Sequence, residues 1–227
     1  MALNLVTPPA LEPVSIEEAR SHCRITSTIE DGLLAGYVLA ARQHVESITN
    51  RTMMTSAWRF VIDEKWPIYY DRKRGFNRKM IQLPKSPVQS VQSIQYIDTN
   101  GATQTLDPSQ YVVYGLHDPT QPAGAIPGLG RIEPAFGIIW PLIRHQGNAI
   151  TINFTAGYGD SPSAMHEALR QAMLMLIAHW FDNRAPALEK ARGLQVPYAV
   201  EALTAPHRIW FGDETHNETF YPYRIWN

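Results

Sequence analysis

The chain has 227 residues, enough for one large domain or two small ones. Its 20 Lys and Arg residues against 21 Asp and Glu give a net charge of −1, which excludes a protein that coats nucleic acid through overall positive charge. Cys23 is the single cysteine, which excludes an intrachain disulfide and a four-cysteine zinc site.

The composition is also low in charge and rich in aromatic residues. Charged residues make up 18% of the chain, below the typical quarter, and the chain holds 10 Tyr and 6 Trp. This fits either a large aromatic core or surfaces covered by partners, because interface cores are depleted in charge and enriched in Trp and Tyr. No run reaches 18 apolar residues and no signal-peptide pattern is visible. We therefore expect no membrane span and a soluble, intracellular product.

A short helix is predicted near the N-terminus. Ser15 and Glu18 have capping-box spacing, in which each side chain bonds the other's backbone amide. The helix is expected to end near Arg24. Cys23 follows His22 in it, but adjacent helical residues point in different directions and no acid is placed to orient the pair. A catalytic thiol is therefore not expected.

A long helix is predicted over about residues 28–50. Asn50 suits a left-handed stop at its end. Polar residues, Arg42 and Glu46 among them, are expected to face away from the core. The apolar stripe that should face the core consists of Leu33, Leu34, Tyr37, Val38, Ala41, Val45 and Ile48.

The middle of the chain is predicted to be β-rich, because its apolar residues alternate with polar ones. Asn100 and Gly101 supply a tight hairpin turn, and Gly- and Pro-rich connections separate the strands, notably at 119–130. The six strands expected are 58–62, 81–83, 91–98, 103–106, 111–114 and 150–154.

A second long helix is predicted over about residues 162–184, with Ser161 as its N-cap. From Ala172 to Ala178 it is apolar on all sides, which is typical of a helix buried on all sides. We expect it to be the central post of a helical bundle, its second face covered by the chain's own sheet or by another subunit. Its candidate core or subunit-interface residues are Met173, Leu176 and Trp180.

These elements predict an α+β fold with segregated helices and strands. The expected domain spans 1–205, with helices in 15–52 and 161–205 around a β-rich insertion at 56–156. One further short helix is expected over 197–204. Residues 206–227 form an extended tail whose aromatic residues show no period, which favours docking either on its own domain or on a neighbouring molecule. The tail residues expected to make these contacts are Trp210, Phe211, Phe220, Tyr221, Tyr223 and Trp226.

One loop between two strands is strongly basic. Either it is a solvated hairpin loop, or it faces DNA or an acidic partner, because several cations release counterions when they meet a polyanion. In a ring of copies these charges would add to a strong local field. The five cations are Arg72, Lys73, Arg74, Arg78 and Lys79.

Catalytic and metal-binding motifs are not found. The stretch from His166 to Arg170 begins like a metalloprotease helix but ends in arginine, so it supplies one ligand at most. No serine sits in a glycine-flanked nucleophile elbow. We expect no enzyme activity, no metal and no cofactor.

Several short motifs, in order, resemble the head–tail connector (adaptor) proteins of tailed phages, prophages and gene transfer agents. Together they cover most of residues 13–210. They are Pro13-Val14-Ser15-Ile16-Glu17-Glu18-Ala19-Arg20, Asn50-Arg51-Thr52, Leu83-Pro84-Lys85-Ser86-Pro87-Val88, Ser90-Val91-Gln92-Ser93-Ile94, Ala156-Gly157-Tyr158-Gly159, His179-Trp180-Phe181-Asp182-Asn183-Arg184 and Val196-Pro197-Tyr198-Ala199-Val200.

The resemblance implies a non-enzymatic neck component, built as a helical bundle with a β insertion. Such proteins form a ring, usually of twelve copies, under the portal protein, and a stopper or tail-completion protein binds beneath. Double-stranded DNA passes through the ring without sequence-specific contacts. The resemblance therefore places the protein at the virion neck, after assembly in the host cytoplasm. The alternatives are another neck component, such as a stopper or tail-completion protein, and a hydrolase carried by a mobile element.

Overall fold

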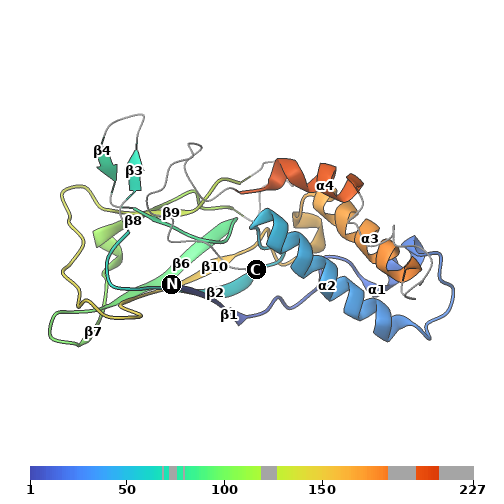
Figure 1. Cartoon of the computed structure of the whole chain (residues 1–227), viewed down its shortest axis with the longest axis horizontal. Coiled ribbons are helices and arrows are strands. Elements are labelled where there is room, and N and C mark those ends of the chain that lie inside the picture. Colours follow the sequence, from blue (N-terminus) through green and yellow to red (C-terminus); the bar gives the residue numbers. More distant parts are fainter. Residues whose placement is uncertain (68, 72–75, 79, 119–126, 184–197, 210–227) are drawn as a thin grey trace.

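The structure is a computed structural model that describes residues 1–67, 69–71, 76–78, 80–118, 127–183 and 198–209. In this part of the chain the α-helices are α1 (Ile16–His22), α2 (Asp31–Thr49), α3 (Glu167–Asp182) and α4 (Tyr198–Thr204). The short 3-10 helices are η1 (Pro108–Gln110), η2 (Pro162–Ala164) and η3 (Ala205–His207). Figure 1 shows the helices gathered at one end of an elongated molecule and the strands at the other. The fold is mixed α+β, as predicted.

The strands are β1 (Ala2–Thr7), β2 (Ser56–Ile62), β3 (Tyr69–Asp71), β4 (Phe76–Arg78), β5 (Ile81–Gln82), β6 (Val88–Ile97), β7 (Thr103–Thr105), β8 (Tyr111–Tyr114), β9 (Arg131–Pro134) and β10 (Ile150–Ala156). They form a five-stranded antiparallel sheet in the order β1-β2-β10-β6-β7, a three-stranded sheet in the order β5-β9-β8, and a β3–β4 hairpin.

The five- and three-stranded sheets share one hydrophobic core. Phe60 of β2 lies opposite Ile152 of β10, which in turn lies opposite Ile94 of β6, so one face of the larger sheet is apolar. Ile81 of β5 and Ile132 of β9 belong to the same buried cluster. The alternation read from the sequence therefore reports a sheet with one face buried.

Strands β1, β3, β4 and β9 were not predicted from the sequence. β1 is an edge strand that pairs only with β2, and its six residues precede Pro8 and Pro9, which end it. β9 pairs with β5 and β8 through four residues inside a Gly- and Pro-rich region. Short strands of this kind are defined by their pairing partners, which local periodicity does not report.

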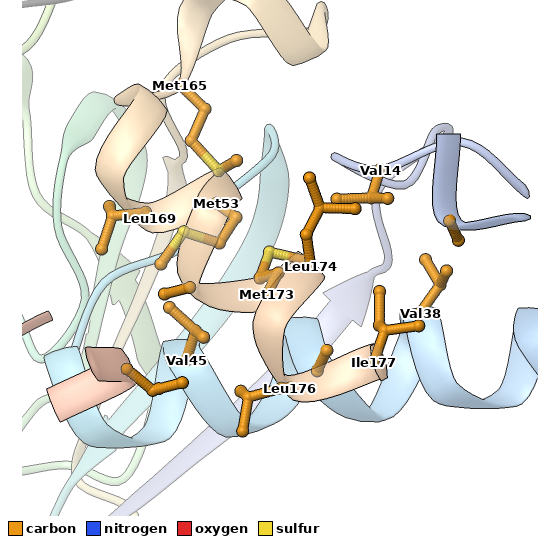
Figure 2. Packing of buried hydrophobic residues seen from close by; sticks show 14 of the residues in the cluster. Val14, Val38, Val45, Met53, Met165, Leu169, Met173, Leu174, Leu176 and Ile177 are labelled. Carbon is orange, nitrogen blue, oxygen red and sulfur yellow. The ribbon is translucent and has the colours of Figure 1, made fainter. Parts of the chain in front are cut away.

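Helix α3 is buried by the chain's own helices. It packs against α1, α2 and α4. Figure 2 shows Val38 and Val45 on the side of α2 that faces Leu176 and Ile177 of α3. The chain's own sheet was one cover expected for the second face of this helix, and α4 with the N-terminal helices covers it instead. Met175 and Trp180 remain half-buried, so cover by another subunit stays a prediction.

The start of α3 differs from the prediction by five residues. Ser161 accepts a hydrogen bond from the Ser163 amide at 3.4 Å, but it caps η2 and not α3. Met165 then adopts an extended conformation, with ψ 150°, which interrupts the helical path. At the end of α2, by contrast, Asn50 has φ 56°, so the predicted left-handed stop is confirmed.

The polar side of α2 also differs from the prediction. Arg42 and Glu46 are buried, because they satisfy each other and two further groups. Arg42 pairs with Glu12 at 2.7 Å and with Glu46 at 3.1 Å, and the Met53 amide donates to Glu46 at 2.9 Å. Burial raises the pKa of Glu46, while the Met53 amide and Arg42 act in the opposite direction. The N-terminal segment carrying Glu12 thus covers a face that the helical pattern assigns to solvent.

Candidate interaction surfaces

Met173 and Leu176 lie in the core of the helical part, and neither is exposed. Trp180, one turn further along α3, is half-buried, with ring centroids 6.3 Å from Tyr37 and 6.2 Å from His44 of α2. Of the three candidates, only Trp180 therefore reaches the surface of the single chain. Burial lowers the pKa of His44, so this ring is held as a neutral packing partner.

The basic loop is flanked by β3 and β4. These strands pair antiparallel, with Tyr69 opposite Arg78, and Figure 1 shows the hairpin projecting away from β1. Arg78 lies in the last position of β4. Residues 72–75 and 79 lie outside the described part of the chain, so four of the five predicted cations are not placed.

The aromatic tail residues from Trp210 to Trp226 also lie outside the described part of the chain. The segment that leads to them is firmly held at the end of α2. The Ile209 amide donates to the Thr49 carbonyl at 3.0 Å, and Asn50 Nδ2 donates to the Ile209 carbonyl at 2.9 Å. Ile48, Asn50, Arg208 and Ile209 line an open pocket of about 220 Å³ beside this exit.

Arg51 fixes the same exit segment from inside the protein. It is 2% exposed, and its Nε donates to the His207 carbonyl at 2.5 Å while its Nη1 donates to the Pro127 carbonyl at 3.0 Å. The ring of His207 is 4.3 Å from that of His166. Burial, with His166 and Arg51 nearby, lowers the pKa of His207 to about 4. The exit of the tail therefore depends on a buried cation and a neutral imidazole.

A surface that the sequence did not predict lies between β9 and β10. Phe136 is fully exposed, Ile139 is 73% exposed and Leu142 is 83% exposed. The loop is nevertheless anchored, because Trp140 is buried in the β core between these residues and stacks on Trp66. We call Phe136, Ile138, Ile139 and Leu142 the apolar tip. The signal in the sequence was an apolar run without strand or helix period.

Among the described residues, neither a metal-binding cluster nor an activated cysteine is present. No group of three or more His, Cys, Asp or Glu side chains there has a geometry that would hold a metal ion. Burial raises the pKa of Cys23, and Asp182 adds to the effect, which is opposite to the activation of a nucleophile. Among the described helices, none is long and apolar enough to cross a membrane.

Residues 13–112 match the family described as phage gp6-like head-tail connector protein. The matched range contains α1, α2, the strands from β2 to β7 and the first half of β8. The resemblance to head–tail connectors seen in the sequence is thereby confirmed. No curated protein matches the chain.

Three solved chains are similar over 95% of this chain and 99% of their own length. One is from the neck of an empty gene transfer agent (GTA) particle computed with C6 symmetry, at 26% identity and a TM-score of 0.70. Another is from the virion of a native GTA particle, at 25% identity and 0.69. A third, from the neck of a native GTA particle computed with C12 symmetry, is 24% identical with a TM-score of 0.67 and shows the fold alone.

Proposed function

We propose that this chain, whose residues 13–112 match the head–tail connector family, is a structural adaptor in the neck of a phage-like particle. It would form a ring under the portal protein, join the capsid to the stopper or tail, and form part of the channel for double-stranded DNA. The observation that carries the proposal is the likeness of nearly the whole chain to a chain of a GTA neck, at a TM-score of 0.70. The role is non-enzymatic, and the place of action is the portal vertex after assembly in the host cytoplasm.

The ring is proposed to hold twelve copies. A neck structure computed with C6 symmetry contains a similar chain, which supports cyclic assembly. A ring joins two different faces of each subunit, and such interfaces bury apolar surface. The apolar tip supplies exposed apolar side chains on a loop whose position Trp140 already fixes, so little conformational entropy is lost on contact. Trp180 remains a candidate for the same interface.

The tail from Trp210 onward is proposed to contact the portal. Its aromatic residues would supply large contact areas at low entropic cost. The support from the structure is the exit at Ile209, which backbone and side-chain hydrogen bonds hold against α2. Docking of the tail on its own domain is the alternative.

The basic loop, with Arg78 at one end, is proposed to face DNA or an acidic partner. Reversing three of its charges should reduce DNA retention or assembly, and the reduction should be larger at low salt. If this variant behaves like the wild type, the loop is a solvated hairpin loop without a partner.

The proposal is tested by electron microscopy of the purified full-length chain, alone and mixed with its portal protein. A ring seated on the portal is expected. No ring in either sample would contradict the proposal. A stopper or tail-completion protein is the second candidate, and direct portal contact with twelvefold symmetry separates the adaptor from it.

A further inference from the structure

The five-stranded sheet has two unlike faces. One face packs on the shared core, while the residues of the other face, apart from the buried Val61, are half-buried or exposed. Ser, Thr, Asn and Gln dominate the second face. We call it the polar sheet face; its polar members are Asn4, Arg59, Ser90, Gln92, Ser93, Gln95, Thr103, Thr105, Thr151, Asn153 and Thr155.

The strand register places these residues side by side. Asn4, Arg59, Asn153 and Ser93 follow one another across four strands. Arg59 Nε donates to Asn153 Oδ1 at 3.2 Å, and Asn153 Nδ2 donates to Ser93 Oγ at 3.0 Å. Gln92 donates to Thr155 on the same face. The side chains therefore form a hydrogen-bonded layer over the sheet.

The charge of the polar sheet face is as distinctive as its hydrogen bonding. Arg59 is the only charged residue among its members, and no carboxylate occurs within strands β2, β6, β7 and β10. Val61 and Ile97 are the large apolar residues that these four strands turn to this side, and neither is exposed. The core of a protein–protein interface is typically apolar and aromatic, and the polar sheet face lacks that composition.

We propose that the polar sheet face lines the channel and lies against the phosphate backbone of double-stranded DNA. The inference rests on the proposed adaptor function. Hydroxyl and amide groups are common hydrogen-bond partners of phosphate oxygens, and these contacts do not depend on base sequence. The lone Arg59 complements the polyanion, while the absence of carboxylates from strands β2, β6, β7 and β10 avoids repulsion; Asp63, just after β2, is paired with the N-terminal ammonium. One cation per copy keeps the attraction weak enough for DNA to move.

The position of the β3–β4 hairpin distinguishes between DNA and an acidic partner as the target of the basic loop. The β3–β4 hairpin leads directly into β5, which belongs to the sheet covering the opposite, apolar face. If the polar sheet face meets DNA, the hairpin is attached to the far side of the β sandwich. An acidic protein partner then becomes the expected target of the basic loop.

A tethered cleavage reagent tests the placement directly. In the full-length chain with Cys23→Ser, iron–EDTA is attached at Thr155→Cys on the polar sheet face. The matched control carries it at Gln43→Cys, an exposed neutral residue of α2. Ring formation is checked first by electron microscopy, and the rings are assembled on linear duplex DNA. Cleavage from the Thr155 position should exceed that from the control position by about fivefold or more, because hydroxyl radicals act only at short range from the tether and DNA binding here is sequence-independent.

Each outcome has a distinct meaning. Rings with equal or stronger cleavage from Gln43→Cys would overturn the inference and leave the adaptor function intact. Failure to form rings with the portal would overturn the adaptor function, and the inference with it.

A charge test gives a second readout. Ser90→Glu with Thr105→Glu adds two acids to the face, and Thr28→Glu with Gln43→Glu adds two to exposed positions of the helical part. The first pair should weaken DNA association by about fivefold or more at about 50 mM salt, while the second should not. Equal effects of the two pairs would overturn the proposal.

Discussion

Trp66 and Trp140 stack in parallel, with ring centroids 4.6 Å apart and planes inclined by 11°. Trp66 Nε1 also donates to the Pro141 carbonyl at 2.8 Å, so Trp66 binds both the ring of Trp140 and the backbone next to it. The Ala135 amide donates to the Gln110 carbonyl, and the Arg144 amide donates to the Ile97 carbonyl. The apolar tip is therefore a fixed part of the β end.

Trp140→Ala should destabilise the chain by about 3 kcal/mol, because it removes a buried aromatic ring and leaves a cavity against Trp66. Urea unfolding followed by far-UV circular dichroism measures this change. Trp140→Phe retains part of the stacking and should lose clearly less. Equal losses for the two variants would show that the stack does not anchor the loop.

Ile139→Ser with Leu142→Ser should leave stability within about 0.5 kcal/mol of the wild type, because both side chains are exposed. The same variant should lose ring assembly, since it removes apolar contact area. Sedimentation velocity and electron microscopy measure assembly. Ile29→Ser is the control, because Ile29 is 91% exposed near the start of α2, at the other end of the molecule. Normal rings from the double variant would exclude the apolar tip from the interface.

Local signals predicted the elements well where one short segment defines them. Ser15 caps α1 by accepting from the Glu18 amide at 3.1 Å, as predicted. The Glu18 carboxylate, which the capping box assigns to the Ser15 amide, pairs with Arg170 of α3 at 2.8 Å. The polar sheet face also has a local signal in the alternation of Thr151, Asn153 and Thr155.

Features that depend on distant partners were not predicted. The burial of Arg42 depends on Glu12, thirty residues away, and helical periodicity contains no information on that partner. The exposure of Leu142 depends on Trp140 filling the core beside it. The low charge and the many aromatic residues predicted surfaces covered by partners, but only the fold shows which apolar side chains are exposed.

The tail can be removed at two positions with different expected results. Deleting 210–227 should abolish portal binding and leave the melting temperature nearly unchanged, if the tail contacts another molecule. Deleting 206–227 should lower stability by about 2 kcal/mol or more, because His207 and Ile209 are buried and Arg51 loses a carbonyl acceptor. Differential scanning calorimetry and portal pull-down measure the two effects. A large loss of melting temperature after deletion of 210–227 would favour self-docking.

The pH dependence of stability should report on the buried exit segment. His207 is 3% exposed, and no hydrogen-bond partner for its Nδ1 atom occurs among the described residues. Its pKa falls from 6.5 to about 4 on folding, because burial, His166 and Arg51 all disfavour the imidazolium form. Between these values the unfolded chain binds more protons than the folded chain. The contribution of His207 to the free energy of unfolding should therefore be fully present above pH 6.5 and should be lost as the pH falls towards 4.

The expected loss over this range is about 3 kcal/mol, from a pKa difference of about 2.5 units. Urea unfolding at closely spaced pH values measures it, with His207→Gln as the control because glutamine does not titrate. The lowered pKa of His44 adds a slope of the same sign, and the raised pKa of Glu46 adds one of opposite sign. Both remain in the control, so the difference between the two curves isolates His207. Parallel curves for wild type and His207→Gln would show that His207 is not held neutral beneath the tail exit.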